Sequence, residues 1–295
     1  MDIEKILKEK LEIIEKAMDH YLPKEKNYQD IIFESMRYSI FAGGKRLRPI
    51  LMMAACEFVN GDIDDVIPFA CAMEMIHCYS LIHDDLPAMD DDDYRRGKLT
   101  NHKVYGDAIA ILAGDGLLNY AYELMIKSSL DKNENNKKII AMNEIASSAG
   151  IHGMIGGQVA DLISENKSID EKTLDFIHKN KTGALIISSI RTGAILGGAT
   201  EKELNALSEY ATNIGLGFQI TDDILDIIGD EEKIGKKVGS DIQNNKATYP
   251  VLYGLDESMK KVQDLFNQSV ESLKSFGQKS DFFINLADYL VKRDY

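Results

Sequence analysis

The stretch MEMIHCYSLIHDDLPAMDDDDYRR, from Met73 to Arg96, joins an apolar helical pattern to a dense group of charged residues. Its first half has apolar residues at the spacing of a buried helix, and Pro87 follows as a helix-ending residue. Six acidic residues lie between Asp84 and Asp93, and two arginines close the stretch. Because carboxylates at the end of a core helix need partners, this stretch is the first candidate for a functional site.

The helix in this stretch has one polar edge. We expect the helix to begin at Pro68, because proline is favoured in the first helical turn. His77, Ser80 and Asp84 follow at positions i, i+3 and i+7, so the edge becomes more polar toward the C-terminal end. A lone histidine on such a helix is usually a satisfied core residue, but its alignment with Asp84 favours a functional role.

A second acidic cluster, DDILD at residues 222–226, ends another apolar helical pattern. The apolar stripe consists of Leu204, Leu207, Ala211, Ile214 and Phe218. Asp222 and Asp226 continue its edge at steps of four residues and are predicted to face the interior, whereas Asp223 points away. Two carboxylate clusters, with lysines and arginines between them, predict a divalent-metal site for a strongly anionic substrate.

The composition favours a soluble helical protein. The chain has 295 residues, 44% of them hydrophobic, with five prolines, no tryptophan and few alternating runs. Its net charge of −14 argues against nucleic-acid binding, which requires a basic surface. We predict a single all-α domain over residues 1–295.

The cysteines and the N-terminus are those expected of a protein in a reducing cytoplasm. Cys56, Cys71 and Cys78 are an odd number of cysteines in apolar helical contexts, without the CxxC spacing, and are predicted to be reduced and buried. The N-terminus lacks the apolar centre of a signal peptide, and no uncharged apolar run reaches the roughly 20 residues of a membrane span. We therefore expect a cytoplasmic protein without a membrane span.

Helix signals recur along the rest of the chain. We expect helices over residues 3–20, 28–42, 107–125, 139–163 and 250–291. Capping boxes are predicted at Ser168 with Glu171 and at Thr200 with Glu203. The KTG sequence at 181–183 predicts a break in a helix, and the lysine-rich segment 230–248 predicts a loop that could act as a lid.

A group of cations marks the start of another helix. Lys45, Arg46 and Arg48 follow Gly43-Gly44, and Pro49 suits the first turn. Backbone N–H groups at a helix start and three cations form a candidate anion site. A solvated basic turn is the alternative.

Together these elements favour metal-assisted chemistry on a diphosphate. Mg²⁺ prefers carboxylate, phosphate and water oxygens, and it commonly takes one or two protein carboxylates plus substrate phosphates. Metals and cations make diphosphate a good leaving group, and apolar helix walls can shelter a hydrocarbon chain from water. Neither a Ser-His-Asp set nor a GxxxxGK[ST] loop is present. A solvated or calcium-binding acidic loop remains an alternative, although neither cluster has EF-hand spacing.

Six ordered segments resemble the trans-isoprenyl diphosphate synthases, and among them the bacterial farnesyl diphosphate synthases. They are GGKRLRP (43–49), IHCYSLIHDDLPAMDDDDYRRGKLTNH (76–102), GGQVAD (156–161), KTGALI (181–186), GFQITDDILD (217–226) and GSDIQNNKATYP (239–250). The resemblance implies an all-α bundle of antiparallel helices around a deep central cavity, the isoprenoid synthase fold, in a homodimer.

The resemblance implies a role for individual residues. Mg²⁺, three ions in each active site or Mn²⁺ in their place, would be held by Asp84, Asp85, Asp90, Asp222, Asp223 and Asp226. The diphosphate of isopentenyl diphosphate would be held by Lys45, Arg48, His77 and Arg96. The diphosphate of the allylic substrate, dimethylallyl or geranyl diphosphate, would be held by Arg95, Lys181, Lys236 and Lys246. Thr182 and Gln219 would line the reacting centre.

Product length in the resembling family depends on side chains below the first aspartate motif. Tyr79 and Ser80 occupy these positions, and the bulk of Tyr79 predicts a fifteen-carbon product, farnesyl diphosphate. A geranylgeranyl-producing enzyme is the nearest alternative. A terpene cyclase is disfavoured by DDILD, and a non-catalytic metal-binding or regulatory subunit would leave both aspartate clusters idle.

Overall fold

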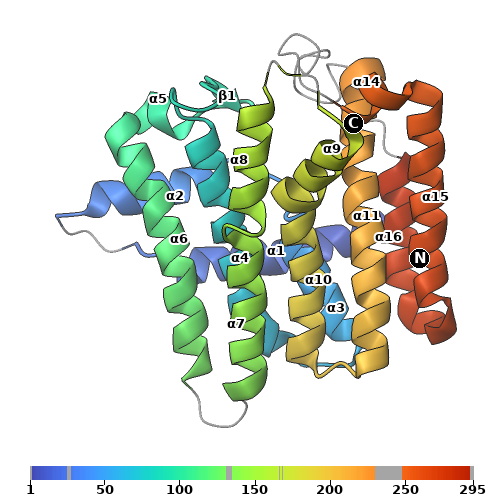
Figure 1. The fold of residues 1–295 in the computed structure, drawn as a ribbon. Coiled ribbons are helices and arrows are strands. Elements are labelled where there is room, and N and C mark those ends of the chain that lie inside the picture. Colours follow the sequence, from blue (N-terminus) through green and yellow to red (C-terminus); the bar gives the residue numbers. More distant parts are fainter. Residues whose placement is uncertain are drawn as a thin grey trace.

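The computed structural model describes residues 2–24, 28–130, 135–165, 167, 169–229 and 248–292 (Figure 1). Its first helices are α1 (Ile3–Tyr21), α2 (Asp30–Ile40), α3 (Leu47–Phe58), α4 (Ile63–Asp84), α5 (Asn101–Tyr105), α6 (Asp107–Ser129), α7 (Asn135–Ala149) and α8 (Met154–Ser164). They are followed by α9 (Glu171–Ile177), the π-helix η1 (His178–Gly183), α10 (Ala184–Gly197), α11 (Glu201–Ile228), α14 (Tyr249–Tyr253), α15 (Leu255–Leu273), the 3₁₀-helix η2 (Lys274–Ser280) and α16 (Asp281–Lys292).

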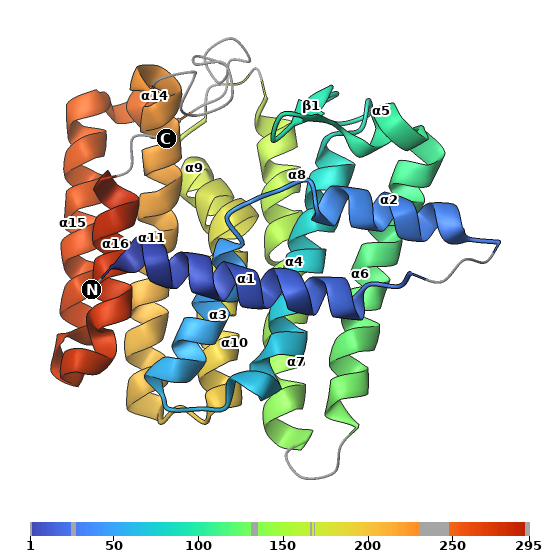
Figure 2. The same cartoon turned by 180° about the vertical axis from the view of Figure 1, so that it is seen from behind.

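The fold is all-α, as predicted. The long helices stand side by side, and α1 and α2 cross them on one face (Figure 2). Within the described ranges the only strands are β1 (Tyr94–Arg95) and β2 (Lys98–Leu99), which form a short antiparallel hairpin. This hairpin was not predicted, because two-residue strands are too short to produce an alternating pattern.

Helix α4 lies at the centre of the main hydrophobic core. Phe69, Ala72, Met73 and Ile76 are all fully buried, and α4 packs against α3, α6 and α10. The helix is apolar on nearly all sides, as expected of a helix surrounded by protein. Glu74 is an exception, since it is charged and only 2% exposed.

The prediction that Pro68 begins this helix is wrong, because α4 begins five residues earlier. The side chain of Asp62 accepts a hydrogen bond from the Asp64 backbone N–H and caps the helix, and Asp64 and Asp65 occupy the first turn. Pro68 therefore stands inside the helix. The acidic cap was the stronger start signal in the sequence.

Other helix boundaries depend on local chemistry. The capping box of Thr200 and Glu203 is confirmed at the start of α11. The capping box predicted for Ser168 with Glu171 is wrong, because Asp170 caps α9 and Glu171 is its first residue, while Ser168 itself lies outside the described residues. The predicted helix over 139–163 is divided between α7 and α8 by a turn at residues 150–153. Residues 181–183 lie in η1, which continues directly from α9 into α10, so the helix changes to a π-helix at this place and the predicted break is wrong.

Two helices, α4 and α6, are long and apolar enough to cross a membrane by length and composition alone. The core helix of a soluble protein meets the same criteria, and 72% of the most apolar window of α4 is buried inside the protein. In α6 the corresponding fraction is 39%, so this helix presents apolar side chains on the surface. The three cysteines are buried and free, as predicted.

Candidate active site

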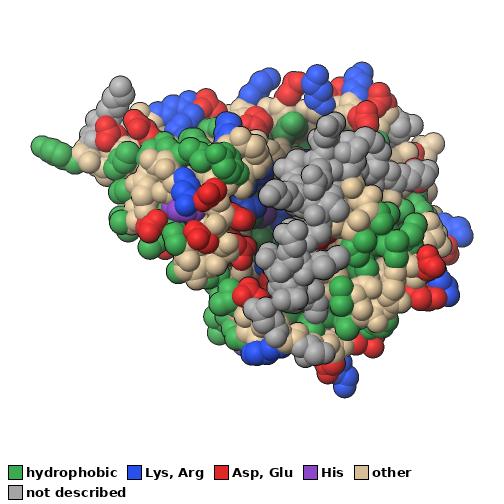
Figure 3. Space-filling view, turned by 90° about the horizontal axis from the view of Figure 1, so that it is seen from above, with side chains coloured by type: hydrophobic (Ala, Val, Ile, Leu, Met, Phe, Trp, Pro, Cys, Tyr) green, Lys and Arg blue, Asp and Glu red, His purple; other side chains and the backbone are tan. Residues whose placement is uncertain are grey.

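A cavity of about 540 Å³ lies among α3, α4, α6, α8, η1 and α10. Arg48 from α3, His77 and Asp84 from α4, and Lys181 and Thr182 from η1 contribute its polar lining. The remaining wall is mainly apolar and includes Tyr79, Met89, Leu118, Met154, Val159 and Leu185. Seen from above, acidic and basic side chains gather around a hollow in this surface (Figure 3). The sequence therefore brings charged groups and an apolar wall into one space.

The first aspartate motif folds back on itself at the end of α4. The backbone N–H of Asp90 donates to the carbonyl of Asp84 at 2.8 Å, so the turn after Pro87 places both ends of the motif together. Burial raises the pKa of Asp84 to about 6; Lys181 opposes this shift and Asp90 adds to it. The charges of Asp84 and Asp90 therefore act on each other and on Lys181.

Lys181 lies on the opposite wall of the cavity, in the π-helix. Its Nζ donates to Asp161 Oδ2 at 2.5 Å. Burial alone would lower the pKa of Lys181, but Asp161, Asp84 and Asp90 together raise it. A Cβ at Gly157 would lie 2.1 Å from the Lys181 backbone nitrogen, so glycine is required where α8 meets η1. Asp161, the last residue of the GGQVAD segment, is therefore the partner of Lys181.

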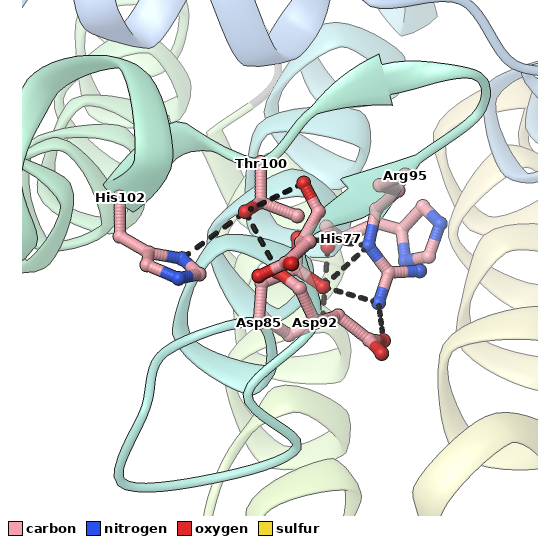
Figure 4. A network of polar contacts seen from close by, with 8 residues as sticks. His77, Asp85, Asp92, Arg95, Thr100 and His102 are labelled. Atoms are coloured by element: carbon pink, nitrogen blue, oxygen red, sulfur yellow. Dashed lines mark hydrogen bonds and ion pairs between the residues drawn. The ribbon is translucent and has the colours of Figure 1, made fainter.

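Asp85 and Arg95 form a two-point ion pair (Figure 4). Arg95 Nε lies 2.8 Å and Nη2 2.5 Å from Asp85 Oδ1, and the Asp85 residue is 3% exposed. Asp92 lies 3.7 Å from the same guanidinium. Asp85 therefore holds Arg95 at the edge of the site, in addition to its predicted role near the metal.

The turn of Asp90 to Asp93 is held by the hairpin region that follows it (Figure 4). Thr100 Oγ1 donates to the Asp92 carbonyl at 2.7 Å and lies 3.2 Å from His102 Nδ1. The Asp93 carboxylate lies 2.6 Å from Lys103 Nζ. These contacts fix the turn, and Asp84 and Asp90 are the members of the motif whose charges act on Lys181.

Arg48 and His77 form a second polar region in the cavity. Burial lowers the pKa of Arg48, and its Nε is buried with no hydrogen-bond acceptor among the described residues. Burial and the neighbouring Arg48, Arg96 and Arg95 hold the pKa of His77 well below its usual value, so His77 is neutral near pH 7. A buried guanidinium N–H without an acceptor suits an anionic ligand, as the sequence predicted.

Lys45 and Arg96 flank this region. Lys45 is exposed at the start of α3, and Arg96 donates to the carbonyl of Gly43. Arg46, the third cation of the predicted anion site, is 3% exposed and pairs with Glu74. It is therefore a buried structural cation, and the prediction of three cations facing one anion is wrong for Arg46.

The aspartates of the second motif lie on different sides of α11. The negative charge of Asp222 acts on Arg48 and raises its pKa, so the second motif lies on the Arg48 side of the site. Asp226 is 1% exposed, in agreement with the predicted inward edge. Asp223 was predicted to point away from this edge, yet it is 4% exposed, because η1 and α14 cover that side of α11.

Asp223 connects three elements. Its Oδ2 accepts a hydrogen bond from the Tyr249 backbone N–H at 3.0 Å and lies 3.5 Å from His178 Nε2. Gln219 Nε2 lies 3.4 Å from Asp223 Oδ1, so Gln219, predicted at the reacting centre, is on this side of α11. Lys236, Lys246 and nearly all of the predicted 230–248 lid lie outside the described residues.

The carboxylates fit a metal that completes its shell with substrate oxygens. Among the described residues, no three histidine, cysteine or acidic side chains are grouped closely enough to hold an ion by themselves. Asp84 lines the cavity, the backbone of Asp90 is bonded to that of Asp84, and the charge of Asp222 acts on Arg48 in the same cavity. Mg²⁺ commonly binds one or two carboxylates together with waters and phosphates. The donor set therefore fits Mg²⁺ bound with a diphosphate and does not resemble a closed structural metal site.

Comparisons with known proteins agree with this geometry. The chain is 48% identical to a geranylgeranyl diphosphate synthase of Cyanophora paradoxa, with 98% of this chain and 95% of the relative covered. It is 46% identical to a farnesyl diphosphate synthase of Geobacillus stearothermophilus, with 100% and 99% covered. The apo crystal structure of a FPP/GFPP synthase from Zymomonas mobilis matches with a TM-score of 0.88, 34% identity, and 98% and 99% covered. The polyprenyl synthetase family profile matches residues 29–281, and the chain belongs to this family of prenyltransferases.

Proposed function

We propose that this chain condenses isopentenyl diphosphate with dimethylallyl diphosphate and then with geranyl diphosphate, head to tail, to give (2E,6E)-farnesyl diphosphate. The observation that carries the proposal is one cavity lined by Asp84 and Lys181, by Arg48 and His77, and by apolar side chains. Two groups of charged residues suit two diphosphates, and the apolar wall suits a growing hydrocarbon chain.

The residues of the chain bind and orient the substrates. Arg48 and neutral His77 hold isopentenyl diphosphate, while Lys181 and Arg95 hold the allylic diphosphate. Mg²⁺ held by Asp84 and its partners would neutralise the charge on the departing diphosphate as its C–O bond breaks. The apolar wall keeps water from the allylic carbocation, which the isopentenyl double bond attacks. The proton lost in this step goes to the departing diphosphate.

We propose three Mg²⁺ ions in each active site, with Mn²⁺ as a substitute. Asp84, Asp90 and Asp222 are the proposed direct ligands. Asp85, Asp223 and Asp226 surround them, and the contacts of Asp85 with Arg95 and of Asp223 with Tyr249 give these two carboxylates a second, positioning role.

Product length is proposed to depend on Tyr79 and Ser80. Tyr79 is 6% exposed and lies against the cavity, where its ring limits the length of the hydrocarbon chain. Geranylgeranyl diphosphate is the alternative product, and the Cyanophora relative carries the name of that activity. The bulk of Tyr79 favours the shorter product.

We propose that residues 1–295 act as one domain in a cytoplasmic homodimer. Exposed apolar side chains on α6 and α8 are suited to burial against a second copy. They include Ile111, Leu112, Ile126 and Ile163, which are 44–61% exposed. Light scattering should give twice the chain mass, and a monomer at micromolar concentration would contradict the dimer.

Release of inorganic diphosphate tests the proposed reaction. The protein is mixed with geranyl diphosphate, isopentenyl diphosphate and Mg²⁺, and diphosphate is measured with a coupled assay. We expect release that needs both substrates and stops with EDTA. Equal release without isopentenyl diphosphate would indicate hydrolysis and contradict condensation.

A further inference from the structure

The buried ion pair between Arg46 and Glu74 is unusual in its position. Glu74 lies in the middle of α4, and its side chain is 3% exposed, while that of Arg46 is 1% exposed. Arg46 Nη1 lies 2.9 Å from Glu74 Oε1, and Arg46 Nε lies 2.8 Å from Glu15 Oε1 on α1. One guanidinium therefore ties the start of α3 to α1 and α4.

The same guanidinium also holds the loop between α2 and α3. Arg46 donates to the carbonyls of Ile40 and Gly43, so it bonds to both ends of residues 40–43. Its own backbone has φ of +48°, a left-handed conformation that is rare for arginine. Side-chain contacts must compensate for this disfavoured backbone, and here they are provided from within the core.

Arg96 holds the loop from the other side. It donates to the Gly43 carbonyl, which also accepts from Arg46, and a Cβ at Gly44 would lie 2.5 Å from Arg96 Nη1. Gly44 also has φ of +130°, so only glycine fits this turn. The loop is thus fixed between a buried arginine and one at the edge of the site.

The fixed loop leads directly to the cavity. Arg46 is the N-cap residue of α3, and Arg48 follows two residues later with its buried Nε lacking a described acceptor. Glu74 stands one helical turn before His77 on α4, so the ion pair lies beneath the Arg48–His77 region. The negative charge of Glu74 also acts to raise the pKa of Arg48 and the pKa of Arg96.

We propose that Arg46 and Glu74 are positioning residues for isopentenyl diphosphate. Their ion pair fixes the 40–46 loop and thereby sets Arg48 and Arg96 around the diphosphate. Neither residue is among those that line the cavity. This inference rests on the proposed function, because it assigns the Arg48–His77 region to isopentenyl diphosphate.

Glu74→Gln tests the proposal, since it keeps the shape of the side chain and removes its charge. We expect the KM for isopentenyl diphosphate to rise by about tenfold or more, the effect of losing one charge-assisted contact. The KM for geranyl diphosphate should change less than about twofold. Isothermal titration of isopentenyl diphosphate into metal-free protein should give a parallel rise in Kd.

The double variant Arg46→Met with Glu74→Met separates positioning from stability. A buried ion pair can often be replaced by apolar side chains with little loss of stability. We therefore expect the urea midpoint to return toward that of the unsubstituted protein, while the weak binding of isopentenyl diphosphate persists. If Glu74→Gln does not fold, Arg46→Lys decides the same question, because lysine lacks the fork of donors that reaches two carboxylates and two carbonyls.

Lys10→Met is the matched control, since Lys10 is 7% exposed and lies 2.5 Å from Glu57 in another α1–α3 ion pair. It should lower stability without changing the binding of isopentenyl diphosphate. Unchanged KM and Kd in Glu74→Gln, or recovery of both in the double variant, would overturn the proposal. An equal loss of binding in Lys10→Met would overturn it too. If the unsubstituted protein performs no condensation, the proposed function fails, and the titrations alone still decide whether the ion pair sets this anion site.

Discussion

Replacing Tyr79 by alanine should lengthen the product. Tyr79 lies five residues before Asp84, which is about 7.5 Å along α4 at 1.5 Å per residue. Its ring packs edge to face against His83, with centroids 5.7 Å apart, so the ring is held in the wall of the cavity. Alanine keeps only the Cβ, and we expect the main product to change from fifteen carbons to twenty or more. Buried aromatic-to-alanine changes cost about 3–5 kcal/mol, and the ring's exposure to a cavity favours the lower value.

The assay uses labelled isopentenyl diphosphate with geranyl diphosphate and resolves the dephosphorylated alcohols by chain length. Tyr79→Phe retains the ring and should keep the original product. Tyr210→Phe is a control for lost stability, since Tyr210 is fully buried and its hydroxyl donates to the Phe283 carbonyl at 2.8 Å. Its product should not change. The same alcohol from Tyr79→Ala as from the unsubstituted protein would refute the assignment of Tyr79 as the limit of the cavity.

Three further predictions follow from the charged groups. Asp84→Asn keeps the side-chain size but removes the charge that would bind metal, and diphosphate release should fall on the order of 10²–10³-fold; activity within threefold of normal would contradict this role. Burial and Arg48 hold the pKa of His77 below the usual 6.5, so the unfolded chain binds an extra proton as pH falls and stability is lost below that pH. Urea unfolding at pH 7 and at pH 5 should therefore show a smaller fall in the free energy of unfolding for His77→Gln than for the unsubstituted protein, and an equal fall in both would contradict the neutral state of His77. Asp223→Ala leaves the Tyr249 N–H without its acceptor and should lower the free energy of unfolding by about 1–3 kcal/mol, and an unchanged urea midpoint would argue against this contact.

The sequence predicted those features of the site that depend on the residue pattern within a single helix. The alignment of Asp84 with His77 and the inward direction of Asp226 come from helical periodicity together with the apolar residues that precede them. The capping box at Thr200 is a local signal that is present in the structure, and the KTG sequence at 181–183 marks the place where the helix changes to the π-helix η1. Such features need no knowledge of which helices become neighbours.

Features that depend on neighbouring helices could not be predicted in this way. A helical wheel of α11 places Asp223 away from the apolar stripe. The wheel carries no information about η1 and α14, which pack against that side and bury the Asp223 carboxylate. Arg46 looks like Lys45 and Arg48 in sequence, and only the position of Glu74, 28 residues later, turns it into the core. The prediction places the start of α4 too late, because the acidic cap at Asp62 is a stronger helix-start signal than Pro68.

The most direct test of the central claim is incubation with labelled isopentenyl diphosphate, dimethylallyl diphosphate and Mg²⁺, followed by separation of the dephosphorylated products by chain length. The cavity, its two charged regions and the position of Tyr79 lead us to expect farnesol as the dominant alcohol. A longer alcohol would keep the reaction and contradict the role of Tyr79. No elongation from any allylic primer, with the protein folded, would contradict the proposed function.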